Sequence, residues 1–296
     1  MLIFIGEGRL GNQVFQLRYL RSARAPGETI VAVGLESTAD IFELEPGIRI
    51  IRLGKWGKRI VRHLLLALVL RPLAANLRLI NYATEVPASC GDGTDGSGLA
   101  NVRTGLFARL TLVDGGYYQA ARHWPAVLPA DDFRIRPARQ AVADALYRQV
   151  GSGQPCAFVH VRRGDYTQWS AYGQSDLALP ATYYLAGIRE ILALAPEARI
   201  AFVTDDPAWV REHLAPACPG STVVAGTEAD DFCFMRACDA GVISNSTFSL
   251  AAALLMYRAE IIVGPRHWLG FRSAEWLPPG IEFSNARIRY IAVGSS

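Results

Sequence analysis

Short apolar runs alternate with longer helical segments along most of the chain. The runs expected to form strands are Leu2–Ile5, Thr29–Val33, Ile48–Leu53, Cys156–Val161, Arg199–Val203, Ser221–Val224, Gly241–Ile243 and Glu260–Val263. The segments expected to form the helices of the second half are Pro137–Val150, Ala181–Leu194, Pro207–Leu214, Asp230–Cys238 and Ser249–Arg258. This alternation is typical of parallel sheets covered by helices, so we predict an α/β fold with two doubly wound, Rossmann-like domains.

Three prolines mark the expected boundary between these domains. Pro125, Pro129 and Pro137 interrupt the periodicity just before the long helix of the second half. A length of 296 residues leaves room for two cores. We therefore predict an N-terminal domain over residues 1–133 and a C-terminal domain over residues 134–296, with a Gly-, Ser- and Asp-rich loop at residues 89–100 of the first.

Composition narrows the class of protein. Hydrophobic residues make up 51% of the chain and charged residues 19%, which fits a compact globular fold. The five cysteines are widely spaced and form no Cys-x-x-Cys pair, so we expect reduced thiols and no structural metal site. The sequence opens on an apolar run with no basic leader before it, and we expect a cytoplasmic protein with no nucleic-acid partner.

A basic segment stands out against the small net charge of +3. Residues 46–84 contain no Asp or Glu, and their basic residues are Arg49, Arg52, Lys55, Lys58, Arg59, Arg62, Arg71 and Arg78. The apolar run within it, Leu64–Leu70, is far shorter than the roughly 20 residues that span a bilayer. Two interpretations stay open: segment 49–78 is a core helix with solvated charges, or it lies on the inner face of an anionic membrane.

The first loop carries a glycine pattern. Gly6, Gly8 and Gly11 form Gly-x-Gly-x-x-Gly between a strand and a helix, and Glu36 follows about 25 residues later. This spacing is typical of a dinucleotide-binding site, in which backbone amides at a helix N-terminus approach a diphosphate. A nucleotide-sugar enzyme needs the same chemistry. An NAD(P)-dependent oxidoreductase is therefore one alternative.

Two adjacent arginines leave the first strand of the second half. The segment Phe158–Tyr166 reads Phe-Val-His-Val-Arg-Arg-Gly-Asp-Tyr, so that Arg162 and Arg163 stand at a sharp turn. Paired guanidinium groups at a strand end present several donors in a fixed fork, which suits a diphosphate.

Two further polar segments follow later strands. Asp205 and Asp206 precede a proline that can begin a helix, and one of the carboxylates can accept hydrogen bonds from guanine while the other caps the helix. Ser244–Ser249 reads Ser-Asn-Ser-Thr-Phe-Ser and opens an Ala-rich helix. Its backbone amides can bind an anion without a positive side chain.

These segments, together with Gly8–Gln16 (Gly-Arg-Leu-Gly-Asn-Gln-Val-Phe-Gln), resemble motifs of the α-1,2-fucosyltransferases of glycosyltransferase family 11. The resemblance is dense over residues 156–268 and local over residues 6–17. It implies a GT-B-like architecture, with the donor on the C-terminal domain and the active site in the cleft between the domains. This chain departs from the family at Leu250–Leu254, which replaces a Trp-rich continuation.

The resemblance implies a role for each matching residue. Residues expected to contact the GDP-fucose donor are Gly11, Asn12, His160, Arg162, Arg163, Asp205, Asp206, Asn245, Ser246, Thr247 and Phe248. Arg163, Asp165 and Asn12 are the expected catalytic residues. Asp165, Glu7 and His123 are candidates for the general base, and the choice among them stays open.

The implied reaction is an inverting transfer of L-fucose from GDP-β-L-fucose, with O2 of a galactoside in an oligosaccharide or lipid-linked glycan as the expected acceptor. Because the sequence has no Asp-x-Asp triplet, we expect no cofactor and no required metal. The departure at Leu250–Leu254 leaves a nucleotide-sugar-binding protein without activity as a further alternative.

Overall fold

The computed structural model describes residues 1–85, 104–125, 132–284 and 287–294. The chain divides into two compact units, Met1–Arg134 and Ile135–Ser296, which are described one at a time. The expected loop at residues 89–100 and the proline at position 129 lie outside the described residues.

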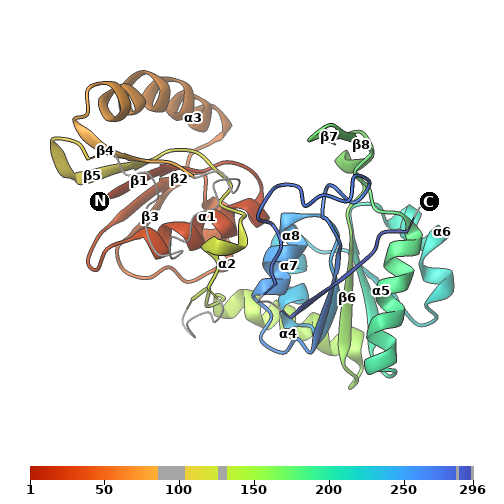
Figure 1. Cartoon of the computed structure of the whole chain (residues 1–296). Helices are drawn as coiled ribbons and strands as arrows, with labels where there is room; N and C mark the ends of the chain where they lie inside the picture. Colours follow the sequence, from red (N-terminus) through yellow and green to blue (C-terminus); the bar gives the residue numbers. More distant parts are fainter. Residues whose placement is uncertain (86–103, 126–131, 285–286, 295–296) are drawn as a thin grey trace. The chain divides into compact units, whose positions relative to one another are not determined.

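Unit 1 is a parallel sheet with helices on its faces (Figure 1). Its strand order is β3-β2-β1-β5-β4, and every neighbouring pair is parallel. The strands are β1 (Leu2–Ile5), β2 (Ile30–Val33), β3 (Ile48–Ile51), β4 (Ile80–Ala83) and β5 (Phe107–Val113). The helical elements are α1 (Leu10–Ala23), α2 (Glu36–Ile41), α3 (Lys55–Ile60), the π-helical η1 (Val61–Leu70) and η2 (Pro72–Asn76), and η3 (Ala121–His123).

The core of unit 1 forms where α1 packs on the sheet. Leu10, Val14 and Leu17 of α1 are almost completely buried, because they recur at the helical spacing of three and four residues. Near the end of the same helix the ring of Tyr19 stacks on that of Tyr118, with 3.8 Å between the ring centroids. These contacts hold α1 in the core of unit 1.

Unit 2 contains a larger parallel sheet, of order β10-β9-β6-β11-β12-β13. Its strands are β6 (Cys156–Val161), β9 (Arg199–Thr204), β10 (Thr222–Val224), β11 (Ala240–Val242), β12 (Ile261–Pro265) and β13 (Ile288–Ile291). Its helical elements are α4 (Pro137–Gly151), η4 (Asp165–Thr167), α5 (Ala181–Leu194), α6 (Pro207–His213), η5 (Ala215–Ala217), α7 (Glu228–Ala237) and α8 (Thr247–Leu254). A short hairpin, β7 (Ser170–Ala171) and β8 (Gln174–Ser175), follows η4.

The strand order of unit 2 predicts where a ligand binds. The chain passes from β6 to β9 and β10 on one side and then returns to β11 on the other side of β6. Such a reversal leaves a crevice outside the carboxyl ends of the two diverging strands, and open α/β sheets bind their ligands there. In unit 2 this point lies between β6 and β11.

The predicted α/β class with two Rossmann-like domains is confirmed. Every predicted strand is present within two residues of its expected bounds. The prediction of the last helix was wrong at its C-terminal end, because α8 stops at Leu254 and the chain turns before it enters β12 at Ile261. Among the described residues five strands were not predicted: β4, β5, the short β7 and β8, and β13.

Candidate functional site

Three polar segments meet at the carboxyl edge of the sheet in unit 2. Arg162 and Arg163 follow β6, Asp205 and Asp206 follow β9, and Ser244 follows β11. Because β6 pairs with both β9 and β11, the arginine turn lies between the other two segments. His160 and Ser244, which are 84 positions apart in the chain, are thereby neighbours in the fold.

Arg162 is held from two sides. Its Nη1 lies 2.8 Å from Oδ2 of Asp205, and its Nη2 lies 2.6 Å from Oδ1 of Asp165. The side chain is only 15% exposed. These two ion pairs fix the direction of the guanidinium group and the shape of the turn that follows β6.

Arg163 has a different environment. Its backbone amide donates a hydrogen bond to Oδ1 of Asp205 (2.9 Å), while its guanidinium carbon lies 4.1 Å from the centroid of the Trp209 ring. Nε of Arg163 is buried, lies 3.6 Å from Oδ2 of Asp206, and has no hydrogen-bond partner among the described residues. Stacking on an indole thus holds the guanidinium plane while donor groups stay available to a ligand.

The two aspartates after β9 have separate structural roles. Asp205 accepts hydrogen bonds from the arginine turn at both carboxylate oxygens. Asp206 caps α6, since its Oδ1 accepts from the backbone amide of Trp209 (3.1 Å). A Cβ atom at Gly164 would lie 2.7 Å from Oδ2 of Asp205, which explains a glycine in this turn. Asp205 is therefore a positioning residue for both arginines.

His160 lies beneath the arginine turn, near the end of β6. Its Nδ1 is 2.8 Å from Oγ of Ser244, and its ring packs against Phe248 with 5.4 Å between the ring centroids. Burial, with a smaller effect of the nearby Arg162, lowers the pKa of His160 to about 3. The imidazole is therefore neutral near pH 7 and links β6 to β11 by a hydrogen bond.

The N-terminus of α8 forms the third side of the site. Asn245 donates from Nδ2 to the carbonyl oxygen of Leu177 (2.8 Å), while its Oδ1 is buried without a hydrogen-bond partner among the described residues. The hydroxyl of Tyr166 donates to the carbonyl oxygen of Asn245 (3.3 Å) and so ties η4 to this loop. Ser246 is the N-cap residue, and the first amide groups of α8 follow it with no partner inside the helix.

The unusual sequence of α8 has a packing reason. Leu250, Ala251, Ala252 and Ala253 are all at most 2% exposed, and α8 packs closely beside α7. Short side chains allow this approach, and a tryptophan at any of these positions would need space that the fold does not provide. The departure from the family sequence therefore changes the helix contacts and leaves Ser244–Ser249 in place.

The remaining predicted residues belong to unit 1. Gly8 has a φ angle of +85°, and a Cβ there would overlap the side chain of Asn12. Oδ1 of Asn12 accepts a hydrogen bond from Nε2 of Gln119 (2.9 Å), and Gly11 is buried in the first turn of α1. Asn12 and Gly11 belong to unit 1, whereas the arginine turn belongs to unit 2.

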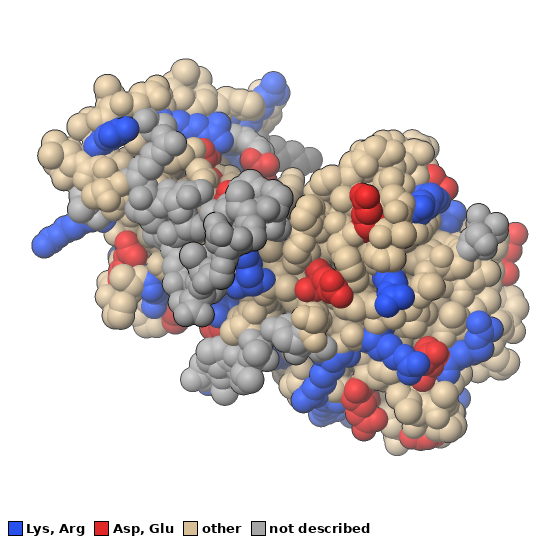
Figure 2. Space-filling view, in the orientation of Figure 1, with Lys and Arg blue, Asp and Glu red and all other residues tan. Residues whose placement is uncertain are grey.

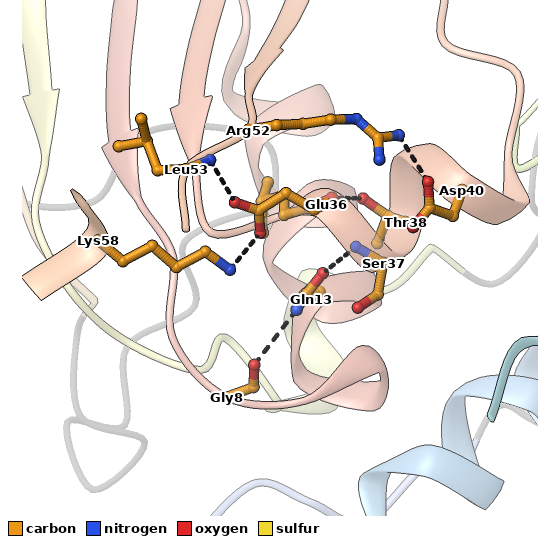
Figure 3. A network of polar contacts seen from close by, with 10 residues as sticks. Gly8, Gln13, Glu36, Ser37, Thr38, Asp40, Arg52, Leu53 and Lys58 are labelled. Atoms are coloured by element: carbon orange, nitrogen blue, oxygen red, sulfur yellow. Dashed lines mark hydrogen bonds and ion pairs between the residues drawn. The ribbon is translucent and has the colours of Figure 1, made fainter. Parts of the chain in front are cut away.

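Glu36 has a structural role that the glycine pattern alone did not predict. Its Oε2 lies 2.7 Å from Nζ of Lys58, and its Oε1 accepts from the backbone amide of Leu53 (Figure 3). In the same network Oε1 of Gln13 accepts from the backbone amide of Ser37 (3.0 Å) and caps α2. A dinucleotide fingerprint needs its acidic residue for a ribose hydroxyl. Here both oxygens of Glu36 bind protein groups.

A cavity of about 250 Å³ opens at the carboxyl edge of the sheet in unit 1. Its lining includes Glu7 after β1, Asp114 after β5, and Arg71. Arg71 makes a bidentate ion pair with Asp114, with both distances 2.8 Å, and the hydroxyl of Tyr82 also donates to Asp114. Glu7 was predicted as a candidate base from the sequence. The network of Arg71, Tyr82 and Asp114 was not predicted, because these three residues belong to no recognisable motif.

His123, the other candidate base in unit 1, is enclosed by aromatic rings. Its ring centroid is 5.1 Å from that of Tyr19 and 5.9 Å from that of Tyr118. Burial, with a smaller effect of Arg122, lowers the pKa of His123 to about 4. These contacts are those of a packed core histidine.

The part of the chain that the structure describes contains neither a metal-binding cluster nor a membrane-spanning helix. Within these ranges no group of three or more His, Cys, Asp or Glu side chains is arranged to hold a metal ion. In the same part of the chain, no helix is both long enough and apolar enough to cross a membrane.

The second half of the chain is similar to known glycosyltransferase sequences. Residues 131–272 match the model of Glycosyl transferase family 11. The O-antigen biosynthesis glycosyltransferase WbnK of Escherichia coli is 33% identical over 115 residues. That match covers 37% of this chain and 38% of the length of WbnK.

Comparison with solved structures supports the fold. The glycosyl transferase family 9 protein from Veillonella parvula has a TM-score of 0.55 at 12% identity, covering 100% of this chain and 87% of that one. The fucosyltransferase NodZ from Bradyrhizobium has a TM-score of 0.51 at 18% identity, covering 89% of this chain and 94% of that one. At these identities the likeness shows a shared architecture of two Rossmann-like domains.

Proposed function

We propose that this chain, whose residues 131–272 match the model of Glycosyl transferase family 11, belongs to that family and transfers L-fucose from GDP-β-L-fucose to a sugar hydroxyl. The observation that carries the proposal is the arginine turn after β6. Arg162 and Arg163 are fixed there by Asp205, next to the N-terminus of α8. The motifs that form this site are those that resemble the α-1,2-fucosyltransferases.

The site has the chemistry that a departing nucleoside diphosphate requires. As the bond between fucose and phosphate breaks, negative charge grows on the phosphate oxygens. Arg163, whose guanidinium is held on Trp209, donates charge-assisted hydrogen bonds to these oxygens. The amides at the start of α8 add the positive end of a helix dipole. Fixed groups of this kind stabilise the transition state because they need no rearrangement during the reaction.

The neutral His160 completes the floor of the donor site. Its pKa of about 3 removes a third positive charge from beneath the two arginines at neutral pH. Its hydrogen bond to Ser244 keeps the ends of β6 and β11 in register. His160 acts on the donor mainly by positioning the residues around it, and Asn245–Phe248 make the contacts at the α8 end.

The acceptor hydroxyl needs a base, for which the chain offers two accessible carboxylates. Asp165 is 62% exposed and oriented by Arg162, whereas Glu7 lines the cavity of unit 1. The variants Asp165→Asn and Glu7→Gln distinguish these candidates. The variant that lacks the base should lose transfer of fucose to the acceptor but should still bind GDP. Asn12, held by Gln119, is proposed to orient the substrate near the first loop.

The proposed acceptor is O2 of a galactoside within an oligosaccharide or a lipid-linked glycan, giving an α-1,2 linkage. The motif resemblance supports the linkage. The similarity to an O-antigen biosynthesis glycosyltransferase supports a surface-glycan precursor.

A thermal-shift comparison tests the proposed donor class. A ligand that binds the native state raises its stability by about 2.7 kcal/mol at a hundredfold excess over its Kd. We expect GDP to raise the Tm and UDP, ADP and NAD to have little effect. A shift with NAD and none with GDP would instead support the oxidoreductase that the glycine pattern of the first loop allowed.

A further inference from the structure

An exposed apolar surface follows one side of the helix formed by α3 and η1. Its residues recur about every four positions and so lie on one face of the helix. We define the apolar stripe as Trp56, Ile60, Leu64, Leu65, Leu68 and Val69, all of which are exposed. Trp56 is 78% exposed and Leu68 is 67% exposed, far more than packing in a monomer explains.

The opposite side of the same helix already packs against unit 1. Leu66 of this helix and Ala74 of the following η2 are buried in a cluster with Ile5, Ile80 and Leu112 of the sheet. The helix therefore has two apolar sides, and the core of unit 1 covers only one of them. The interpretation of this segment as a core helix accounts for the buried side and leaves the apolar stripe unexplained.

The surroundings of the apolar stripe are strongly basic. Residues 46–84 include eight Arg and Lys residues and no carboxylate. Arg52, Lys58 and Arg71 pair with carboxylates from outside the segment, namely Asp40, Glu36 and Asp114. Arg59 and His63 lie on exposed positions of the helix. Figure 2 shows Lys and Arg atoms scattered among uncharged ones over this part of unit 1.

We propose that the apolar stripe, with its flanking cations, docks unit 1 on the surface of an anionic lipid bilayer. Apolar side chains beside Arg and Lys are the composition of helices that lie in the plane of a membrane interface. Trp56 at one end of the apolar stripe fits the preference of tryptophan for that interface. The proposal does not depend on the donor or on the reaction.

The positive charge of residues 46–84 distinguishes between two possible partners of the apolar stripe, a lipid surface and a second copy of this chain. Two copies that met through this face would bring two sets of cations together without any carboxylate from the segment between them. Like charges at an interface oppose association, whereas anionic head groups complement the cations. An anionic bilayer is therefore the occupant that this surface fits best.

Vesicle flotation of the full chain tests this surface. We expect binding to phosphatidylglycerol-containing vesicles and weak binding to phosphatidylcholine alone. The triple variant Trp56→Ser, Leu64→Ser, Leu68→Ser should lose at least tenfold in vesicle affinity. Arg59→Ser should lose about fivefold, and less at high salt.

The matched controls lie in unit 2. Leu194 is 63% exposed, so Leu194→Ser removes a comparable apolar side chain, and Arg211→Ser removes an exposed cation. Both should float like the unchanged protein. An unaltered Tm shows that each variant is folded. The proposal is wrong if both vesicle types bind equally weakly, if the triple variant floats normally, or if the apolar stripe causes dimerisation in lipid-free sedimentation.

Discussion

Arg162 and Arg163 are neighbours in sequence but have different partners. Arg162 lies between two carboxylates, and Arg163 stacks on an indole, with its Nε 3.6 Å from a carboxylate oxygen of Asp206. The first arrangement holds the turn, and the second leaves donor groups for a ligand. We therefore assign the main contact with the diphosphate to Arg163.

Substitution of Arg163 by lysine tests this assignment. Lysine keeps the charge, but it loses the planar fork and the stacking on Trp209. Loss of a charge-assisted hydrogen bond costs about 1.5–3 kcal/mol, so Arg163→Lys should weaken GDP binding by about tenfold to a hundredfold in calorimetry. Arg211→Lys, an exposed change on α6, is the control. An unchanged GDP affinity in Arg163→Lys would remove Arg163 from the donor site.

The buried His160 predicts a pH dependence of stability. Its pKa is about 3 in the folded chain and about 6.5 when unfolded, so between these values the unfolded state binds one more proton. Stability therefore falls as the pH drops from 6.5 towards 3, by up to about 1.4 kcal/mol per pH unit.

Urea unfolding between pH 7 and pH 5 measures this effect. His160→Gln should show a smaller loss of stability on acidification than the unchanged protein, because the variant has no imidazole to protonate at this position. His123, whose pKa is also lowered, contributes equally to both proteins. Identical pH dependences would show that His160 is protonated alike in both states.

The sequence was sufficient to predict several residues of this site, but it was not sufficient to predict the contacts between them. The motif Phe158–Tyr166 identified both arginines as candidates. The proline after Asp206 predicted a helix N-cap, and in the structure Asp206 caps α6. The bonds of Asp205 to the arginine turn were not predictable, because they join β6 and β9 through space. Trp209 follows Asp206 by three residues, but its stacking on Arg163 depends on where α6 begins and could not be predicted from the sequence.

At the scale of elements, five strands of the sheet in unit 2, β6 and β9–β12, followed from their apolar runs because both faces of a parallel sheet are buried. All six residues of β6 are buried. The strands β4 and β5 were missed for other reasons, since most of β4 is buried as well. β5 has the exposed Phe107 at its start, and β4 spans four residues beside the basic segment.

Gly241 in β11 tests how tightly the central strands are packed. A Cβ there would overlap the ring of Phe158, which is fully buried in β6 and has no room to move. Gly241→Ala should therefore lower the free energy of unfolding by about 1–3 kcal/mol, measured by urea denaturation. Gly54→Ala, with nothing near its added methyl group, should change it by less than about 0.5 kcal/mol. Equal effects would contradict this account of the packing between β6 and β11.

At the scale of the whole molecule, the chain combines two sheets that have separate sets of candidate residues. Unit 2 carries the arginine turn and matches glycosyl transferase family 11. Unit 1 carries Glu7, Asn12 and the apolar stripe, in a region where the sequence offered few motifs. The network of Arg71, Tyr82 and Asp114 emerged only from the fold, since its members come from different elements.

The central claim is a single displacement at fucose in which arginine and a helix N-terminus stabilise the departing GDP. Proton NMR of the product made from GDP-β-L-fucose and a galactoside in excess EDTA tests this most directly. We expect continued turnover and an α-L-fucosyl product, because neither Arg163 nor the amides of α8 need a metal ion. A β-L-fucosyl product, or full loss of turnover that manganese restores, would contradict the account.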